Sequence, residues 1–425
     1  MDKNILTHDI LIIGGGPSGL STALHLTKIA PHLTGRILIL EKEHYPRPKL
    51  CAGGLVADAE IILQRLGLDV SEVPHVDVSA AHFDFEGRGI KISVPKSHTI
   101  RVIRRNEFDH WLAKKTRESG IEIREGVAVK NIIPDKDGVT VETEQGNFRA
   151  LIVVGADGSN GITRRCVFPQ VPVYTARVLE VITPNYSVVA RSAKLDEAIS
   201  GNGKEIASGY TVLACRCRCR PRNTCAARQC RCDEAFFDFF PVQNNIAGYV
   251  WDFPTQINGE PMRCWGIYDT NLLADQNRPQ LKKPLADEMA RHGFNLDDYE
   301  LKGHPIRWYD PGNPVSVPHV LLVGDAAGAD PIFGEGISMA LGYGAIAAQE
   351  ISESIQRDEF SFSRFKRRLV RSGLGQTLFA RWVITYIIYP IKWRWFQILL
   401  WRFLKPIVIL VAWIFVLNWG KRIKI

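Results

Sequence analysis

The chain has 425 residues, of which 46% are hydrophobic and 23% charged, and its formal net charge is +8. This composition suits a globular protein of two or three domains, or one enzyme with a discontinuous core. It excludes a disordered chain, a collagen-like fibre and a polytopic membrane protein. Residues 360–425 hold 13 Lys and Arg and no Asp or Glu, so the rest of the chain, with 40 basic and 45 acidic residues, is mildly acidic. A basic tail on an acidic body argues against a nucleic acid partner and favours one local anionic partner, such as a lipid headgroup layer.

The N-terminus predicts an intracellular protein. Residues 1–8 are polar, and the apolar run at residues 10–13 is too short for the core of a signal peptide. A reducing compartment follows, where nine cysteines in a chain of this length are not expected to form a disulfide scaffold.

Strand and helix signals alternate along the first 160 residues. Short apolar runs typical of buried parallel strands lie at residues 9–13 and 36–41, with a helical pattern of leucines between them. Further strands are predicted at residues 121–124, 139–144, 150–154 and 319–323. Because strands of one sheet lie at both ends of the chain, we predict an α/β fold with a discontinuous Rossmann-like domain, an inserted β-rich domain and a helical C-terminal tail.

The same pattern predicts the domain boundaries. The Rossmann-like domain takes residues 1–78, 101–165 and 305–358. The inserted domain takes a strand segment at 79–100 and its main body at 166–304, and the tail takes 359–425.

A glycine motif at the first strand–helix junction predicts dinucleotide binding. Gly14 allows a tight turn, Gly16 lets the backbone approach a pyrophosphate, and Gly19 lets helix and strand pack closely. Glu41 ends the second strand, 22 residues after Gly19, and its carboxylate can accept hydrogen bonds from ribose hydroxyls. The alternative is a glycine-rich turn in an unrelated α/β domain.

Two later motifs favour FAD among the dinucleotides. Asp157 and Gly158 follow the strand at 150–154, and Asp325 follows the strand at 319–323, with a second glycine turn at 334–336. An acidic side chain at a strand end suits a ribityl hydroxyl, and a glycine turn that opens a helix presents backbone N–H groups to an anionic group. Together these motifs fit an FAD that is held at both halves.

The combined motifs resemble a known family. The chain is similar to FAD-dependent oxidoreductases of the aromatic hydroxylase fold in Gly14-Gly-Gly-Pro-Ser-Gly19, Arg105-x-x-Phe108-Asp109, Gly155-Ala-Asp-Gly158 and Gly324-Asp-Ala-Ala with Gly334-Glu-Gly-Ile337. Two stretches resemble the geranylgeranyl reductase branch: Pro46-Arg-Pro-Lys49-Leu-Cys51-Ala-Gly53-Gly54 and Tyr249-Val-Trp251-Asp-Phe253-Pro254. The resemblance covers residues 8–350. Ala52 and Ile246 depart from the branch's pattern, where a glycine and, in some members, a proline stand.

The expected cofactor contacts lie in these motifs and at the strand ends beside them. They are Gly14, Gly16, Pro17, Ser18, Gly19, Glu41, Lys42, Lys49, Cys51, Ala52, Gly53, Gly54, Arg105, Ala128, Asp157, Gly158, Asp325, Gly334, Gly336 and Ile337.

The resemblance implies reduction of an isolated carbon–carbon double bond, which needs a hydride, a proton and an apolar pocket that excludes water. Tyr249, Trp251 and Phe253 alternate, so on a strand they project from one face. We interpret them as an aromatic wall for an isoprenoid chain. Without the resemblance, an ordinary packed strand face would be favoured.

Cys51 is the fourth candidate catalytic residue. Lys49 is close in sequence, and a neighbouring cation could lower the thiol pKa, so that Cys51 acts on the flavin or in proton delivery. The alternative is a small buried residue that lets the backbone approach FAD. The electron donor also has two candidates, because a single glycine fingerprint leaves either transient NADPH binding or a ferredoxin-type carrier.

Six Cys and six Arg lie between Cys215 and Cys232. Their Cys-x-Cys steps fit poorly with the pair spacing of zinc sites and with the spacing of iron–sulfur sites. We expect an adventitious or disordered insertion, with a metal site as the alternative, and assign no metal ligand.

The tail predicts contact with a membrane. Its charge-free runs, residues 382–391 and 406–420, are shorter than the about 20 residues that a spanning helix needs. Six of the ten Trp lie here among Lys and Arg, a composition typical of membrane interfaces. We expect a monotopic C-terminal anchor, with the catalytic body on the cytoplasmic side. The alternatives are a single-pass tail anchor and a helical cap packed on the FAD domain.

The expected function is an FAD-dependent reductase of isoprenoid double bonds, in a geranylgeranyl group or a polyprenyl quinone or lipid. Its expected partners are that substrate, the membrane surface and the electron donor. Three alternatives stay open: an FAD-dependent monooxygenase of the same fold, a prenyl-lipid escort without redox chemistry, and a quinone oxidoreductase that only relays electrons.

Overall fold

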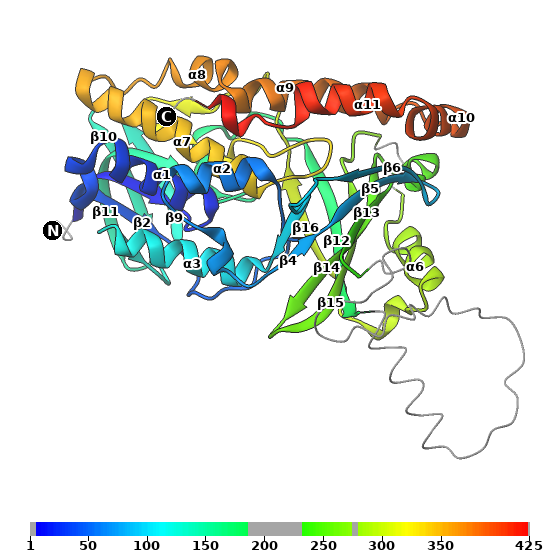
Figure 1. Cartoon of the computed structure of the whole chain (residues 1–425). Coiled ribbons are helices and arrows are strands. Elements are labelled where there is room, and N and C mark those ends of the chain that lie inside the picture. Colours follow the sequence, from blue (N-terminus) through cyan, green and yellow to red (C-terminus); the bar gives the residue numbers. More distant parts are fainter. Residues whose placement is uncertain (1–5, 186–231, 274–278, 424–425) are drawn as a thin grey trace, which may run out of the picture.

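The computed structural model describes residues 6–185, 232–273 and 279–423, which are arranged around three sheets (Figure 1). The largest sheet has the order β17–β18–β11–β1–β2–β8, and β10 and β9 extend from β11. The strands from β18 to β8 are parallel. The members of this sheet are β1 (Leu6–Ile13), β2 (Ile37–Leu40), β8 (Glu122–Arg124), β9 (Val129–Asp135), β10 (Gly138–Thr143), β11 (Gly146–Gly155), β17 (Ser316–Val317) and β18 (Val320–Leu322). The α/β fold predicted from the sequence is confirmed.

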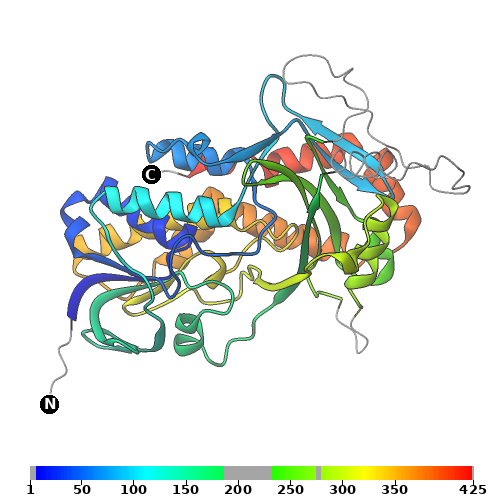
Figure 2. The ribbon, with the colours of Figure 1, turned by 90° about the horizontal axis from the view of Figure 1, so that it is seen from below.

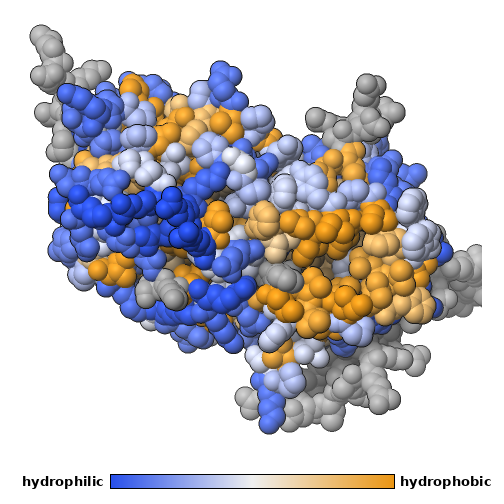
Figure 3. Space-filling view, turned by 90° about the horizontal axis from the view of Figure 1, so that it is seen from above, coloured by the Kyte–Doolittle hydropathy of each residue, from blue (hydrophilic) through white to orange (hydrophobic). Residues whose placement is uncertain are grey.

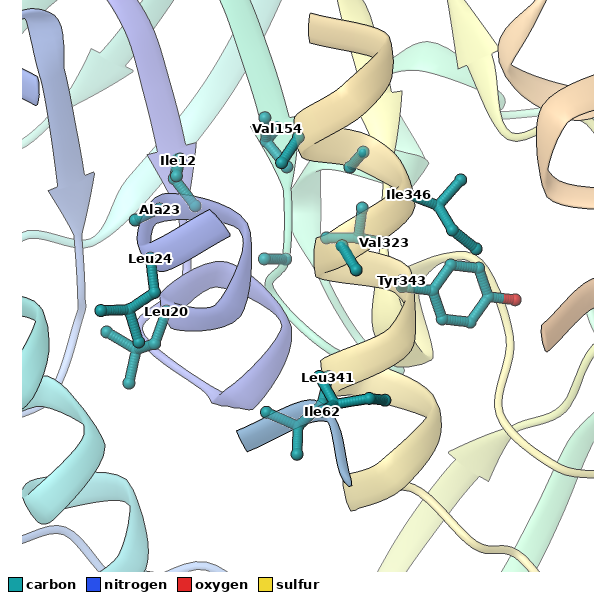
Figure 4. Close-up of a cluster of buried hydrophobic side chains, with 14 of the residues drawn as sticks. Ile12, Leu20, Ala23, Leu24, Ile62, Val154, Val323, Leu341, Tyr343 and Ile346 are labelled. Carbon is teal, nitrogen blue, oxygen red and sulfur yellow. The ribbon is translucent and has the colours of Figure 1, made fainter. Parts of the chain in front are cut away.

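Helices cover this sheet on both faces. They are α1 (Pro17–Ile29), α2 (Ala57–Arg65), α3 (Arg105–Glu118), the short α4 (Ile162–Val167) and α7 (Ile337–Arg357). In the view from below, α3 lies in front of the sheet, whereas α7 lies behind it (Figure 2). The core packs β1 and β11 against α1 and α7 (Figure 4). A side chain at Gly344 of α7 would place its Cβ 2.6 Å from Ser21 of α1, so small residues set the close approach of these two helices.

The second sheet has seven strands in the order β16–β12–β15–β14–β13–β5–β6. They are β5 (Ala80–Phe85), β6 (Arg88–Ser93), β12 (Thr175–Pro184), β13 (Glu234–Asp238), β14 (Gly248–Ile257), β15 (Glu260–Asp269) and β16 (Lys302–Arg307). The predicted boundary at residue 304 therefore falls inside β16. A small third sheet has the order β3 (Gly54–Leu55), β7 (Ile100–Ile103) and β4 (His75–Val78), and β5 and β6 of the second sheet lie between β4 and β7 in sequence.

The two faces of the second sheet pack against different parts of the molecule. One face packs Val250, Trp265 and Ile267 against α6 (Lys282–Arg291). The opposite face carries Tyr249, Trp251 and Phe253, in a separate cluster. Period-two alternation along β14 thus sends its aromatic residues away from α6 and toward the other domain.

The tail crosses the top of both domains (Figure 1). Its segments are α8 (Phe365–Arg371), α9 (Gly373–Ile388), α10 (Arg394–Ile398), the π-helical turn η6 (Leu399–Phe403), α11 (Lys405–Val411), the π-helical turn η7 (Ala412–Val416) and η8 (Gly420–Arg422). The chain then returns to the first domain, where Trp419 is fully buried and the Gly420 N–H donates to Asp58 Oδ1 at 2.7 Å. Within the described ranges, no single helix is long and apolar enough to cross a membrane. The segments Arg394–Phe403 and Lys405–Ile414 pass that test only as a pair, with a bend of 77° between them.

The predicted Cys- and Arg-rich insertion lies outside the described residues, except for Cys232.

Candidate active site

The glycine motif leaves open space at the start of α1. Gly14 has a φ of +105°, and a Cβ there would lie 2.4 Å from the Ala156 carbonyl oxygen. A Cβ at Gly19 would lie 2.1 Å from the carbonyl oxygen of Gly14, so both glycines are required by the fold itself. A Cβ at Gly16 would meet only Arg47 Nη2, at 3.7 Å. Gly16 is also the N-cap residue of α1, and no side chain accepts a hydrogen bond from the first backbone N–H groups of this helix. These N–H groups are therefore directed at this space.

A buried charge network lies beside the glycine motif. Glu41 Oε2 accepts a hydrogen bond from the Gly15 N–H at 2.8 Å. Asp109, fully buried, pairs with Arg105 through two hydrogen bonds of 2.8 and 2.9 Å and with Arg47 Nη2 at 3.2 Å. Burial lowers the pKa of Arg105, but the charge of Asp109 outweighs it and raises the pKa overall. The network holds two guanidinium groups between the glycine motif and the cavity described below.

The two acidic strand-end residues take different positions. Asp157 Oδ2 accepts hydrogen bonds from the backbone N–H and the hydroxyl of Thr163, at 2.8 and 2.9 Å, so this carboxylate orders the turn before α4. Asp325 lines the cavity instead. Arg307 connects the loop after Asp157 with the loop after Asp325. Its guanidinium donates hydrogen bonds to the carbonyl oxygens of Ser159 and Ala326, both at 2.8 Å.

The second glycine turn opens α7, the longest of the described helices. Gly334 has a φ of +66°, and a Cβ there would lie 2.7 Å from the Tyr268 ring. Gly336 is the N-cap residue of α7, and no side chain accepts a hydrogen bond from the first backbone N–H groups of this helix. Ser338 Oγ is buried and has no hydrogen-bond partner among the described residues. This helix start, like that of α1, therefore has unfilled donors that suit an acceptor group.

A cavity of about 480 Å³ lies where the two large domains and the tail meet. Thirteen of the predicted site residues line it: Lys49, Cys51, Ala52, Gly53, Gly54, Arg105, Tyr249, Trp251, Phe253, Asp325, Gly334, Gly336 and Ile337. The others lie around the glycine motif and the neighbouring strand ends, away from the cavity wall: Gly14, Gly16, Pro17, Ser18, Gly19, Glu41, Lys42, Ala128, Asp157 and Gly158. Lys42 and Ala128 are exposed. The predicted residues thus fall into two groups, one on the cavity wall and one around the glycine motif.

The predicted aromatic wall is present as a surface of the cavity. Tyr249, Trp251 and Phe253 are each about 5% exposed and all line it from β14. The Tyr249 hydroxyl donates to the Phe333 carbonyl oxygen at 2.5 Å, which joins the wall to the loop before the second glycine turn. Contact of this wall with a substrate stays a prediction.

The predicted lowering of the Cys51 thiol pKa is wrong. Burial raises the pKa of Cys51, and the cation that opposes this effect most is Arg105 rather than Lys49. Lys49 Nζ lies 3.2 Å from His304 Nε2, and burial lowers the pKa of both groups, that of His304 to about 4. The alternative, a small buried residue that lets the backbone approach the cofactor, agrees with the structure.

The residues present fit FAD. The space over Gly16 and the uncapped start of α1 suit a pyrophosphate, and the uncapped start of α7 beside Asp325 suits the flavin end of the molecule. A family model described as an FAD binding domain matches residues 7–234, more than half of the chain. The chain belongs to this FAD-binding family.

Relatives of this flavoprotein support the narrower resemblance. Digeranylgeranylglycerophospholipid reductase 1 of Methanopyrus kandleri is 27% identical over 380 residues, which cover 84% of each chain. A geranylgeranyl bacteriochlorophyll reductase-like structure from Thermoplasma acidophilum has a TM-score of 0.72 at 20% identity and covers 98% of both chains. The fold is also shared with p-nitrophenol 4-monooxygenase from Pseudomonas putida, with a TM-score of 0.62 at 18% identity over 96% of this chain and 98% of that one. The resemblance to the geranylgeranyl reductase branch is confirmed, and the protein is an FAD-dependent oxidoreductase.

Sequence reasoning missed several residues of this flavoprotein's site. Glu180 and His304 line the cavity from β12 and β16, and the tail supplies part of its wall from α9 to η7. Glu180 could have been noticed, because a carboxylate interrupts an otherwise apolar strand pattern at 178–182. Arg307 carries no signal in the sequence, since its role depends on two loops far away in the chain.

Proposed function

We propose that this flavoprotein saturates carbon–carbon double bonds in the isoprenoid chain of a membrane lipid, such as a geranylgeranyl ether lipid. The observation that carries the proposal is the cavity, which joins the cofactor loops at Asp325 and Gly334 to a wall of aromatic and aliphatic side chains. An isoprenoid chain has no polar handle, so a long apolar slot is the site that it requires. The names of the digeranylgeranylglycerophospholipid reductase relatives support the same substrate class.

FAD bound at the glycine loops supplies, once reduced, a hydride for transfer to carbon. The chain's own residues have three tasks around that step. Asp325 and the turn at Gly334 hold the cofactor end, the β14 wall positions the alkene, and the tail covers the cavity and keeps water out. NADPH and a small redox carrier both stay candidates for the electron donor.

We further propose that the mouth of the cavity opens onto a lipid bilayer with anionic headgroups. Ile387, Ile407 and Ile409 line the cavity and yet are between 44 and 56% exposed, so they lie at its opening. Figure 3 shows apolar side chains gathered on this upper face, over one half of the molecule. Its most exposed members are Phe403, Trp393, Trp413 and Trp395. Indole rings beside Lys392, Arg394 and Lys405 give the apolar and cationic pattern that an anionic bilayer surface attracts.

The function is tested by anaerobic turnover. The protein is purified with its FAD, reduced with dithionite, and mixed under argon with a digeranylgeranyl glycerolipid. The expected result is flavin reoxidation and a lipid mass gain of about 2 Da for each bond saturated, one hydride plus one proton. Phe253→Ala is expected to slow this reaction with flavin absorption retained, whereas Ile257→Ala, exposed on the same strand and outside the cavity, serves as the control.

Two results would contradict the proposal. Reoxidation by air alone, with oxygen inserted into an apolar compound, identifies the monooxygenase that shares this fold. A purified protein that binds the lipid but retains no flavin identifies an escort protein.

A further inference from the structure

The second sheet brings the carboxyl group of Glu180 to the cavity, beside the aromatic wall. Glu180 of β12 lies opposite Gly266 of β15, which in turn lies opposite Trp251 of β14. Directly opposite residues in antiparallel strands share a face, so Glu180 projects from the same face as the aromatic wall. A Cβ at Gly266 would lie 2.1 Å from the Trp251 ring. The absence of a side chain at Gly266 therefore lets that ring cross β15 toward Glu180.

The Glu180 carboxyl group is buried, and it forms no ion pair among the described residues. Glu180 is 5% exposed, and its Oε2 atom has no hydrogen-bond partner among the described residues. The Cys51 backbone N–H, the Cys264 thiol and the charges of Arg104 and Lys302 favour the charged form of this carboxyl group, but burial outweighs them. A buried carboxylate in this setting costs much more free energy than a neutral carboxylic acid does.

Burial accordingly raises the pKa of Glu180 to about 7, and the charge of Arg104 only partly opposes this effect. The groups that face it from the packed elements are Cys51, Cys264, Arg104 and Lys302. Both thiols have pKa values raised by burial, so both stay neutral. Near neutral pH a large fraction of the Glu180 side chain therefore carries a proton that it can donate.

Three further proton-bearing groups of the cavity are already engaged. The Tyr249 hydroxyl donates to the Phe333 carbonyl oxygen, and burial raises its pKa well above the usual value. Glu335 pairs with Arg381 at 2.6 Å. Lys49 is hydrogen-bonded to His304, near Asp325.

We propose that the Glu180 carboxyl group is the acid that gives its proton to carbon when a double bond in the cavity is reduced, an inference that rests on the proposed function. The alkene accepts a hydride from reduced flavin at one carbon and the Glu180 proton at the other. The π bond breaks and two C–H bonds form, so the alkene is reduced by two electrons and the flavin is left oxidised. Glu180 becomes a carboxylate and regains a proton from solvent between turnovers.

The test compares Glu180→Gln with Glu180→Asp, and uses Asp58→Asn as the matched control. Asp58 is a buried carboxyl group whose pKa burial raises to about 6, but it lies outside the cavity and accepts from the Gly420 N–H. Infrared titration of the oxidised holoprotein without substrate should show a protonated carboxyl band with a midpoint near pH 7. That band should vanish in Glu180→Gln and persist in Asp58→Asn.

Anaerobic single turnover supplies the second measurement. Glu180→Gln should slow flavin reoxidation by the prenyl lipid about 10²- to 10⁴-fold, the usual contribution of a general acid, and leave reoxidation by air unchanged. The wild-type rate should fall about tenfold per pH unit above pH 7, because the acid form is lost there, and Glu180→Gln should lack this slope. Glu180→Asp should keep the slope at a reduced rate.

Three outcomes are decisive. Glu180→Gln with the wild-type rate and pH slope, or an infrared band that persists in it, refutes the inference and leaves the proposed function intact. Wild-type protein that never reoxidises with the lipid refutes the proposed function itself. If Glu180→Gln does not fold, an unchanged rate and slope in Glu180→Asp refutes the role of Glu180.

Discussion

At the scale of single residues, the three glycines of the nucleotide motif differ in whether the fold or the cofactor requires them. Gly14 and Gly19 have no room for a Cβ because backbone atoms lie 2.4 and 2.1 Å away, whereas Gly16 has open space and a φ of −85° that alanine readily adopts. A methyl group at Gly16 would occupy only the space that the pyrophosphate needs. We therefore predict that Gly16→Ala folds normally but binds FAD at least tenfold more weakly.

The measurement is FAD titration followed by flavin fluorescence, beside thermal unfolding of the apoprotein. Gly14→Ala is the contrasting variant: its positive φ and backbone clash should lower the unfolding temperature of the apoprotein itself. Equal FAD affinity in Gly16→Ala and wild type would show that the pyrophosphate binds elsewhere.

These glycines, and the loops around Lys49 and Asp325, could be predicted because each motif is local in the sequence. Glu180 could not be placed in the site, because its position depends on the register of β12 against β15, about 90 residues further along the chain. The pKa of Cys51 was predicted in the wrong direction for a related reason. The cation close in sequence, Lys49, is directed to His304, and burial by other segments controls the thiol.

At the scale of elements, α9 contributes a buried cation to the loop that carries the second glycine turn. Its Arg381 is 1% exposed and pairs with Asp330 at 2.7 Å and with Glu335 at 2.6 Å, on the loop that carries the second glycine turn. Burial raises the pKa of Asp330, and the charge of Arg381 opposes this effect. The tail helix therefore holds the cofactor loop in place by a buried ion pair.

Arg381→Met leaves two buried carboxyl groups without this cation, and we predict a loss of about 3–5 kcal/mol in the free energy of unfolding. FAD affinity should fall with it, because the loop at Gly334 loses its anchor. The control is Arg357→Met on α7, whose partner Glu353 is surface-exposed and whose loss should cost under about 1 kcal/mol. Urea unfolding and FAD titration measure both effects, and equal stability of the two variants would contradict this role of α9.

The sequence predicted a helical tail with the composition of a membrane interface, and the structure confirms the helices. The sequence could not show that the tail also forms part of the cavity wall. Its aliphatic residues look alike in sequence whether they face the cavity or the solvent. Ile384 and Trp401 face the cavity, whereas Trp395 and Trp413 face outward. The tail is thus packed on the body of the protein as in the alternative of a helical cap, whereas the expected membrane anchor stays a prediction.

At the scale of the whole molecule, charge and apolar surface are segregated. Figure 3 shows the largest apolar area on one half of the upper face, whereas the other half is mainly hydrophilic with smaller apolar areas. Large contiguous apolar patches are unusual on soluble monomers and mark interaction surfaces. Under the proposed function, exposed Ile387, Ile407 and Ile409 at the mouth of the cavity would let a lipid chain pass from a bilayer into the site without crossing water.

We predict that the full-length protein cosediments with vesicles that contain anionic lipid, and binds neutral vesicles more weakly. Replacement of Trp393, Trp395 and Trp413 by Ser should weaken partitioning about tenfold for each indole, because about 60 Å² of apolar surface is worth ~1.5 kcal/mol. Serine at Ile133 and Val173, which are 44 and 45% exposed and lie outside the tail, should change little. Added salt should release the protein from anionic vesicles in particular, since screening removes the attraction of the basic residues. If the tail variant and the control variant partition alike, the upper face is not the membrane contact, and the lipid must reach the cavity by another route.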